Sequence, residues 1–168
     1  MKGLESFNKL AKERYPFEAS GILFQADDEW KIINVKVIDW DWDADEEVKN
    51  LDEFNPNHSI GFHYDKKDWA RAKRIGKKNN WRKLGVIHSH PILNGHNVTE
   101  EVIDDMSQPS DVDLKYARKW GGIRGIVVIG LKEGGPEVLR VRFHDADNND
   151  IEEDTCLFCG KELKDTSG

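Results

Sequence analysis

The apolar segment from Leu84 to Ile87 runs directly into the histidine pair His88-Ser89-His90. A short apolar run of this kind predicts a buried strand. Because side chains alternate along a strand, Leu84, Val86, His88 and His90 should share one face, whereas Ser89 should point the other way and is a poor ligand candidate. The two imidazoles would then start about 6.6 Å apart, from a rise of about 3.3 Å per residue. Both could converge on one ion, so His88 and His90 are candidate zinc ligands.

A candidate third ligand follows in the segment Ser110-Asp111-Val112-Asp113, which comes directly after Pro109. Ser110 is a favourable helix N-cap and Asp113 stands at the capping-box position, so the segment predicts the start of an amphipathic helix. The helix start is the simpler interpretation of this segment alone, but the Asp113 carboxylate could also complete a three-ligand zinc site that leaves the fourth position to water. The two interpretations are compatible, because a helix N-terminus can hold a carboxylate rigidly beside a strand end.

Glu18 stands in the segment Tyr15-Pro16-Phe17-Glu18-Ala19-Ser20-Gly21, immediately before another apolar run. Alone, it would be a surface residue near a helix–strand turn. Taken in order, Pro-x-Glu-x-x-Gly, His-Ser-His-Pro and Pro-Ser-x-x-Asp resemble the JAMM (MPN+) metalloprotease family. The resemblance covers roughly residues 4 to 143, which is most of the chain.

The resemblance implies a role for each matched residue. His88, His90 and Asp113 would bind zinc, and a zinc-bound water would attack the scissile carbonyl. Glu18 would be the general acid/base, a role worth about 10²–10⁴-fold in rate. Ser110 would stabilise the oxyanion, which is worth about 10²–10³-fold. The substrate would be the peptide or lysine isopeptide bond after the C-terminal Gly of a ubiquitin-like or sulfur-carrier-like protein, so the chain would be a deubiquitinase-like hydrolase.

Strands mixed with helices predict an α/β architecture with a mixed central β-sheet flanked by helices. The family resemblance implies the cytidine-deaminase-like sandwich of JAMM/MPN proteins. We expect two helices, over 4–14 and 66–78, the second capped by Asp65, and a third beginning at Ser110. We expect strands over 20–24, 30–38, 59–64, 84–90, 123–130 and 138–143. Deaminases also hold zinc beside a Glu, but their His-x-Glu and Pro-Cys-x-x-Cys spacing is absent here.

Two other functions stay open. One is a non-catalytic MPN-type scaffold that binds ubiquitin-like tails; such members typically lack one or more ligands, whereas all five matched residues are present here. The other is a DNA-associated protein of the RadC branch, which the formal charge of −7 disfavours. A basic run over 66–83 is either a solvated helix face or a dock for an acidic protein surface.

The family usually leaves about seven residues between the second His and the Ser. Here the stretch from Pro91 to Pro109 is longer by about a dozen, and it includes His96 and an acidic run over 99–106. Such an insertion is either a tolerated surface loop or a lid that carries specificity. His96 could replace a ligand, although a solvated turn is the simpler interpretation.

At 168 residues the chain suits one domain, which we place at 1–144, followed by an acidic tail at 145–168. We expect Asp145 to Asp154 to be mobile. Cys156 and Cys159 form a single C-x-x-C, which could be a second zinc site shared between chains, a redox pair or a reduced tail. The chain has no long apolar stretch, so we expect a cytoplasmic protein that binds neither membranes nor nucleic acid. The oligomeric state is left open.

Overall fold

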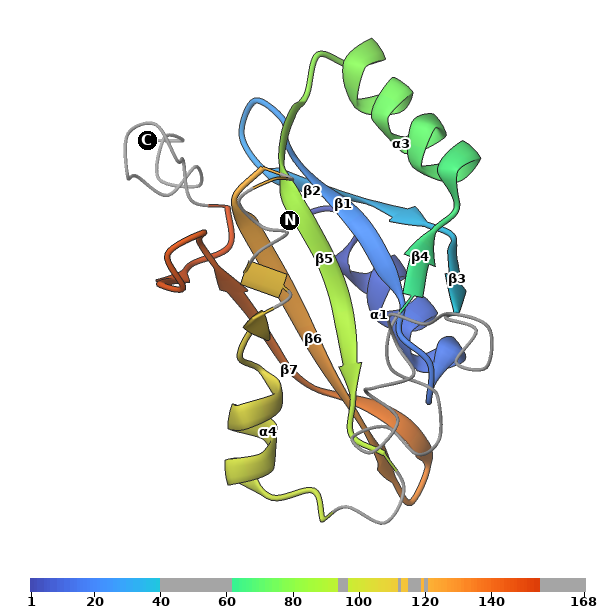
Figure 1. Cartoon of the computed structure of the whole chain (residues 1–168), viewed down its shortest axis with the longest axis vertical. Helices are drawn as coiled ribbons and strands as arrows, with labels where there is room; N and C mark the ends of the chain where they lie inside the picture. Colours follow the sequence, from blue (N-terminus) through green and yellow to red (C-terminus); the bar gives the residue numbers. More distant parts are fainter. Residues whose placement is uncertain (40–61, 94–96, 112, 115–118, 120, 155–168) are drawn as a thin grey trace.

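A six-stranded mixed sheet forms the centre of the molecule. The computed structural model describes residues 1–39, 62–93, 97–111, 113–114, 119 and 121–154 (Figure 1). The elements of this sheet are β1 (Ser20–Gln25), β2 (Trp30–Val35), β5 (Arg82–Pro91), β6 (Ile123–Lys132), β7 (Gly135–His144) and β8 (Asp150–Ile151). The remaining elements are α1 (Leu4–Arg14), β3 (Val37–Asp39), β4 (Phe62–Tyr64), α3 (Lys66–Lys78) and α4 (Glu100–Met106).

The strand order is β2-β1-β5-β6-β7-β8, and β3 and β4 form a separate two-stranded sheet. Only β5 and β6 run parallel; the other neighbours are antiparallel. The connection between β5 and β6 therefore has to cross back along the sheet, and it contains α4 and the segment that begins at Ser110. The expected α/β class, a mixed central sheet flanked by helices, is confirmed.

One face of the sheet packs against α1, which lies behind the sheet in Figure 1. The apolar side of this helix contributes the buried residues Phe7 and Ala11. They join a core that includes Trp30, Ile87 and Val127. This layer leaves the opposite face of β5 available for the histidine pair.

The opposite face carries two smaller apolar clusters. In the first, α3 buries Trp69 and Ala72 against β1, β2 and β5. In the second, α4 packs Ile103 against Ile126 and Val128 of β6. Figure 1 shows α3 and α4 at opposite ends of the sheet. Among the helices that the structure describes, none has the length and apolar character needed to cross a membrane.

The bounds of α3 agree with those expected from the sequence. Its N-cap is Asp65, whose side chain accepts a hydrogen bond from the backbone N–H of Asp68 at 2.9 Å. The strand expected over 30–38 is instead interrupted at Lys36. The N–H of Lys36 donates to the Asp68 carboxylate at 2.6 Å, so β2 and β3 part and enter different sheets.

A β-bulge interrupts β5 near its start. Leu23 pairs with Gly85 and Phe24 with Lys83, which leaves Leu84 without a partner in the ladder. Leu84 consequently turns to the α1 side and packs in the same core as Ile87. The expectation that Leu84 shares a face with the histidines is therefore wrong, because the bulge changes the alternation at that residue.

The expectation of a mobile segment from Asp145 to Asp154 is also wrong. The Asp145 side chain accepts hydrogen bonds from the N–H groups of Asp147 and Asn149, which reverses the chain and lets β8 pair with β7. Asp154 is buried, and its carboxylate accepts from the Trp30 N–H at 2.7 Å and pairs with the N-terminal ammonium at 2.9 Å. Residues 145–149 thus form a turn, and β8 extends the sheet by one short strand.

Candidate metal centre

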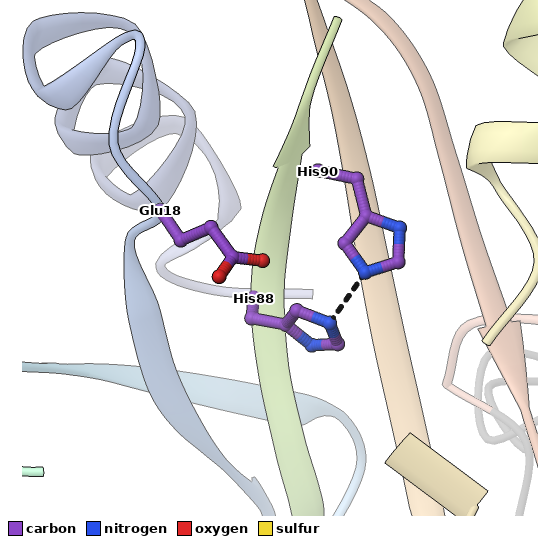
Figure 2. A group of neighbouring side chains, drawn as sticks. All are labelled: Glu18, His88 and His90. Carbon is purple, nitrogen blue, oxygen red and sulfur yellow. Dashed lines mark hydrogen bonds between the residues drawn. The ribbon is translucent and has the colours of Figure 1, made fainter. Parts of the chain in front are cut away.

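His88 and His90 lie on the same face near the end of β5. Ser20 of β1 is the register partner of His88, and Ile126 and Val128 of β6 are the neighbours of the two histidines. The Nε2 atoms of the two imidazoles lie 2.7 Å apart (Figure 2). His88 is buried and His90 is partly buried. The alternation beyond the bulge thus places both imidazoles together, as the spacing predicts.

Glu18 reaches the same place from the segment between α1 and β1, and its carboxylate points toward the two imidazoles (Figure 2). It is buried, and ligand atoms of Glu18, His88 and His90 all lie within 4.8 Å of one another. Its backbone is held from one side by Arg14, whose Nε donates to the Glu18 carbonyl at 2.7 Å. This group of three could hold a metal ion.

Ser89 holds the chain from the other side. Its hydroxyl oxygen accepts a hydrogen bond from the Ala19 N–H at 2.8 Å, and its own N–H donates to the Ala19 carbonyl at 3.0 Å. Ser89 is buried and points away from the imidazoles, as its position predicts. Its contact with the residue next to Glu18 depends on a partner 70 positions away in the sequence, so no local sequence signal marks this role.

The Asp113 carboxylate contacts both histidines. Its Oδ1 lies 3.3 Å from Nε2 of His88, and its Oδ2 lies 3.5 Å from Nε2 of His90. The same Oδ2 accepts from the Ser110 N–H at 2.9 Å, and the Asp113 N–H donates to the Ser110 hydroxyl at 3.1 Å. The capping box and the proximity to the histidines therefore occur together, because the cap points the carboxylate toward the strand end.

Arg124 is a buried cation behind this arrangement. Its Nη2 donates to the Asp113 carbonyl at 3.0 Å, so β6 holds the segment that carries Asp113. Burial lowers the pKa of Arg124, and the neighbouring Asp113 and Tyr64 oppose that shift. Tyr64 in turn shares a hydrogen bond of 2.9 Å with the Ser20 hydroxyl. Arg124 stands in an ordinary strand pattern, so no sequence signal marks it.

The charges at the site follow from burial and proximity. Burial lowers the pKa of His88 to about 4, an effect that Asp113 only partly opposes. For His90, burial is outweighed by the hydrogen bond to Asp113 and the nearby carboxylate of Glu18, so its pKa is raised. For Asp113, burial is outweighed by the two imidazoles, and its pKa lies well below the usual range. At neutral pH the site therefore combines an ionised carboxylate with a neutral imidazole at His88.

The donor set suits a metal ion. Nδ1 of His90 lies 2.7 Å from the Met106 carbonyl oxygen, which can only accept, so this nitrogen carries a proton, and in the neutral ring Nε2 therefore keeps its lone pair. Two imidazole nitrogens and a carboxylate on one point are the ligands that zinc takes in three-ligand catalytic sites. Among the described residues, none hydrogen-bonds to Nδ1 of His88. The residues present thus fit zinc, which His88, His90 and an acidic residue would hold.

Two other sequence predictions cannot be placed. Cys156 and Cys159, the suggested second zinc site, lie outside the described residues, and so does His96. Ser110 is described: its hydroxyl accepts from Asp113, which leaves the hydroxyl hydrogen to donate elsewhere.

No protein-family profile and no curated protein matches the sequence. Among solved structures, the chain is similar to a JAB1/MPN domain protein from Archaeoglobus fulgidus, with 15% identity over 89% of this chain and 90% of that one, and a TM-score of 0.49. It is also similar to a protein from Desulfitobacterium hafniense, with 19% identity over 90% of both chains and a TM-score of 0.49.

Proposed function

We propose that this chain is a zinc-dependent hydrolase that cleaves the peptide or isopeptide bond after the C-terminal Gly of a ubiquitin-like or sulfur-carrier-like protein. The observation that carries the proposal is that His88 and His90 group with the Glu18 carboxylate within 4.8 Å and also contact the Asp113 carboxylate at 3.3 and 3.5 Å, although the four residues come from three separate segments. Burying several ionisable groups together costs free energy, so such a cluster points to a bound ion or to a reaction.

His88, His90 and Asp113 are the residues that we assign to the metal. Zinc held in such a site lowers the pKa of water toward about 7 and polarises carbonyl groups. The Asp113 carboxylate offers negative charge to both imidazole positions, and Arg124 holds its backbone in place. The fixed Nδ1 proton of His90 favours ligation through Nε2.

We assign Glu18 to proton transfer. Its carboxylate faces the imidazoles, and its backbone is fixed by Arg14 and, through Ala19, by Ser89, so that it can accept a proton from water and return it to a leaving amine. A fixed position matters because general acid–base catalysis requires hydrogen-bond reach to the reacting atom. Glu18 could instead be a metal ligand, because it groups with the two histidines; a variant described in the Discussion separates the two roles.

Ser110 is the residue that we assign to the oxyanion. Its hydroxyl hydrogen is left to donate, and the reciprocal bonds with Asp113 fix its position at the helix start. A fixed donor at developing negative charge is the arrangement that lowers the barrier of acyl transfer.

The substrate class rests on the sequence motifs. The C-terminal tail of a ubiquitin-like protein is extended, and an extended segment can bind to the edge of a β-sheet through main-chain hydrogen bonds. Phe17, beside Glu18, is one of the few exposed large apolar side chains among the described residues and could contact such a tail. A cytoplasmic location is part of the same proposal.

The experiment offers the purified protein a linear ubiquitin-like fusion and a lysine conjugate, each with and without a chelator. Cleavage after the terminal Gly that stops with the chelator and returns with added zinc is the expected result. Binding of the tail without cleavage in the zinc-loaded protein would support a scaffold instead. A salt-dependent shift of DNA in a gel, with no cleavage of either substrate, would favour the DNA-associated alternative.

A further inference from the structure

The long connection after Pro91 contacts the candidate metal centre directly. At the last residue of α4, the Met106 carbonyl accepts from Nδ1 of His90 at 2.7 Å. A ligating histidine usually donates its second ring N–H to an acceptor, which fixes its tautomer and ring orientation. Here the acceptor comes from the segment that is longer than the family pattern.

The C-terminal end of α4 is itself held by β7. His144 is fully buried, and its Nε2 lies 2.9 Å from the carbonyl oxygen of Ser107, the residue next to Met106. The Arg142 guanidinium donates to the Ser107 hydroxyl and to Asp104, both at 3.1 Å. Ser107 is completely buried as a result.

Two further contacts position these anchors. Nδ1 of His144 lies 3.2 Å from the Asp150 carboxylate, although without the alignment of a hydrogen bond. Arg142 binds the same carboxylate at 2.6 Å. Below them, Ile103 of α4 is buried against Ile126 and Val128, the latter being the register neighbour of His90. The end of α4 is thus fixed by both polar and apolar contacts.

We propose that α4 is a structural part of the metal centre: the Met106 carbonyl sets the tautomer of His90, and His144 is the positioning residue that keeps this carbonyl in place. The inference rests on the proposed function in taking His90 as a ligand through Nε2. It gives the insertion a role other than a lid or a tolerated surface loop. It also accounts for a buried histidine on β7 that the chemistry does not use.

The test compares two substitutions at one position. His144→Phe keeps a ring in the core but removes the donor to Ser107, whereas His144→Gln keeps an N–H that can reach the same carbonyl. We expect zinc affinity, measured by competition with a chromophoric chelator, to fall about 10- to 100-fold in His144→Phe, as for other outer partners of metal ligands. His144→Gln should restore most of the loss.

A second readout needs neither zinc nor substrate. In the metal-free protein at alkaline pH, long-range ¹H–¹⁵N spectra report which imidazole nitrogen carries the proton. We expect the Nδ1–H form of His90 in the native protein and in His144→Gln, and a mixture of both forms in His144→Phe. The native form of His90 being Nε2–H would overturn the proposal, and so would an unchanged tautomer and zinc affinity in folded His144→Phe.

A surface pair covers the case in which His144→Phe does not fold. Arg142→Ala removes the contact with Ser107, whereas Arg140→Ala removes contacts with the same helix, at Glu100 and Asp104, that do not include Ser107. We expect weaker zinc binding and a mixed His90 tautomer in Arg142→Ala only; equal effects of the two would overturn the proposal. If the native protein binds no zinc, the proposed function fails, and the tautomer comparison alone decides whether α4 positions His90.

Discussion

The hydroxyl of Ser89 accepts a hydrogen bond from the backbone N–H of Ala19 at 2.8 Å, and this bond joins the histidine strand to the residue that follows Glu18. Both partners are buried. The serine between the two histidines therefore helps to place the carboxylate opposite them. Because side chains alternate along β5, the Ser89 hydroxyl lies on the face away from the imidazoles, where it meets the Ala19 N–H.

Replacing Ser89 by Ala should lower the free energy of unfolding by about 1–3 kcal/mol, because the buried Ala19 N–H would lose its acceptor. Urea denaturation checks this value. Ser6→Ala is the matched control, because the Ser6 hydroxyl is exposed and its loss should change stability by less than about 0.5 kcal/mol. Equal effects of the two substitutions would contradict the assigned contact.

Glu18→Gln should separate proton transfer from metal ligation. If Glu18 transfers protons, the variant retains its zinc in elemental analysis and loses about 10²–10⁴-fold in kcat, because the amide cannot accept a proton. Loss of the zinc itself would assign Glu18 to the ligand set. Glu13→Gln, on the exposed side of α1, should match the native protein in both measurements.

Asp113→Asn should weaken zinc binding at least about tenfold, since it removes the negative charge that lies beside both imidazoles. The amide oxygen can still accept from the Ser110 N–H, so the helix start should survive and thermal stability should change little. Asp111→Asn, two residues earlier and exposed, should leave zinc affinity unchanged in a chelator competition. Native affinity in Asp113→Asn would exclude this carboxylate as a ligand.

Gly85→Ala should destabilise the fold by about 1–3 kcal/mol or more, because a Cβ there would collide with the backbone carbonyl of Ile123 on the neighbouring strand. Neither strand can yield without disturbing the β5–β6 ladder that carries the histidines. A thermal melt measures the effect. Gly134→Ala is the control, since a Cβ at Gly134 meets no atom within 4 Å.

The Asp68 carboxylate should make stability depend on pH in the acid range. Hydrogen bonds from Arg71 and then from the Lys36 N–H lower its pKa below 3.8 in the folded protein. A depressed pKa means that the stabilisation is complete above the unfolded value and is lost as the pH falls through the folded value. Urea midpoints measured from about pH 6 down to about pH 3 should therefore fall less in Asp68→Asn than in the native protein. Asp28→Asn, in an exposed turn, should follow the native curve.

Local patterns predict the parts of the site that local structure determines. Strand alternation brings His88 and His90 to one face, and the capping box accounts for the direction of Asp113, because each depends on residues within a few positions. The bounds of α3 follow equally from Asp65 and the helical periodicity. Ser89, Arg124 and the Met106 carbonyl were missed as contributors, because their contacts depend on which distant strands become neighbours.

The same reason explains one of the errors in the fold. The break at Lys36 depends on Asp68, which lies 32 residues further on, and no sequence feature near Lys36 predicts it. The turn at Asp145 is local and could have been found, since Asp followed by Asn and Asp favours side-chain-to-backbone hydrogen bonds. The acidic composition of that stretch obscured the turn, because charge alone predicts solvation rather than a strand.

The bulge at Leu84 has a practical consequence for moving this histidine pair into another protein. It changes the alternation of side chains, so that Leu84 in the bulge and the two imidazoles after it occupy opposite sides of a single sheet. If the strand were copied without the bulge, either Leu84 or the two imidazoles would point to the wrong face of the sheet. In such a graft, the alternation of side chains therefore has to be counted from Gly85. The neighbouring strand has to pair with a strand that carries one extra residue.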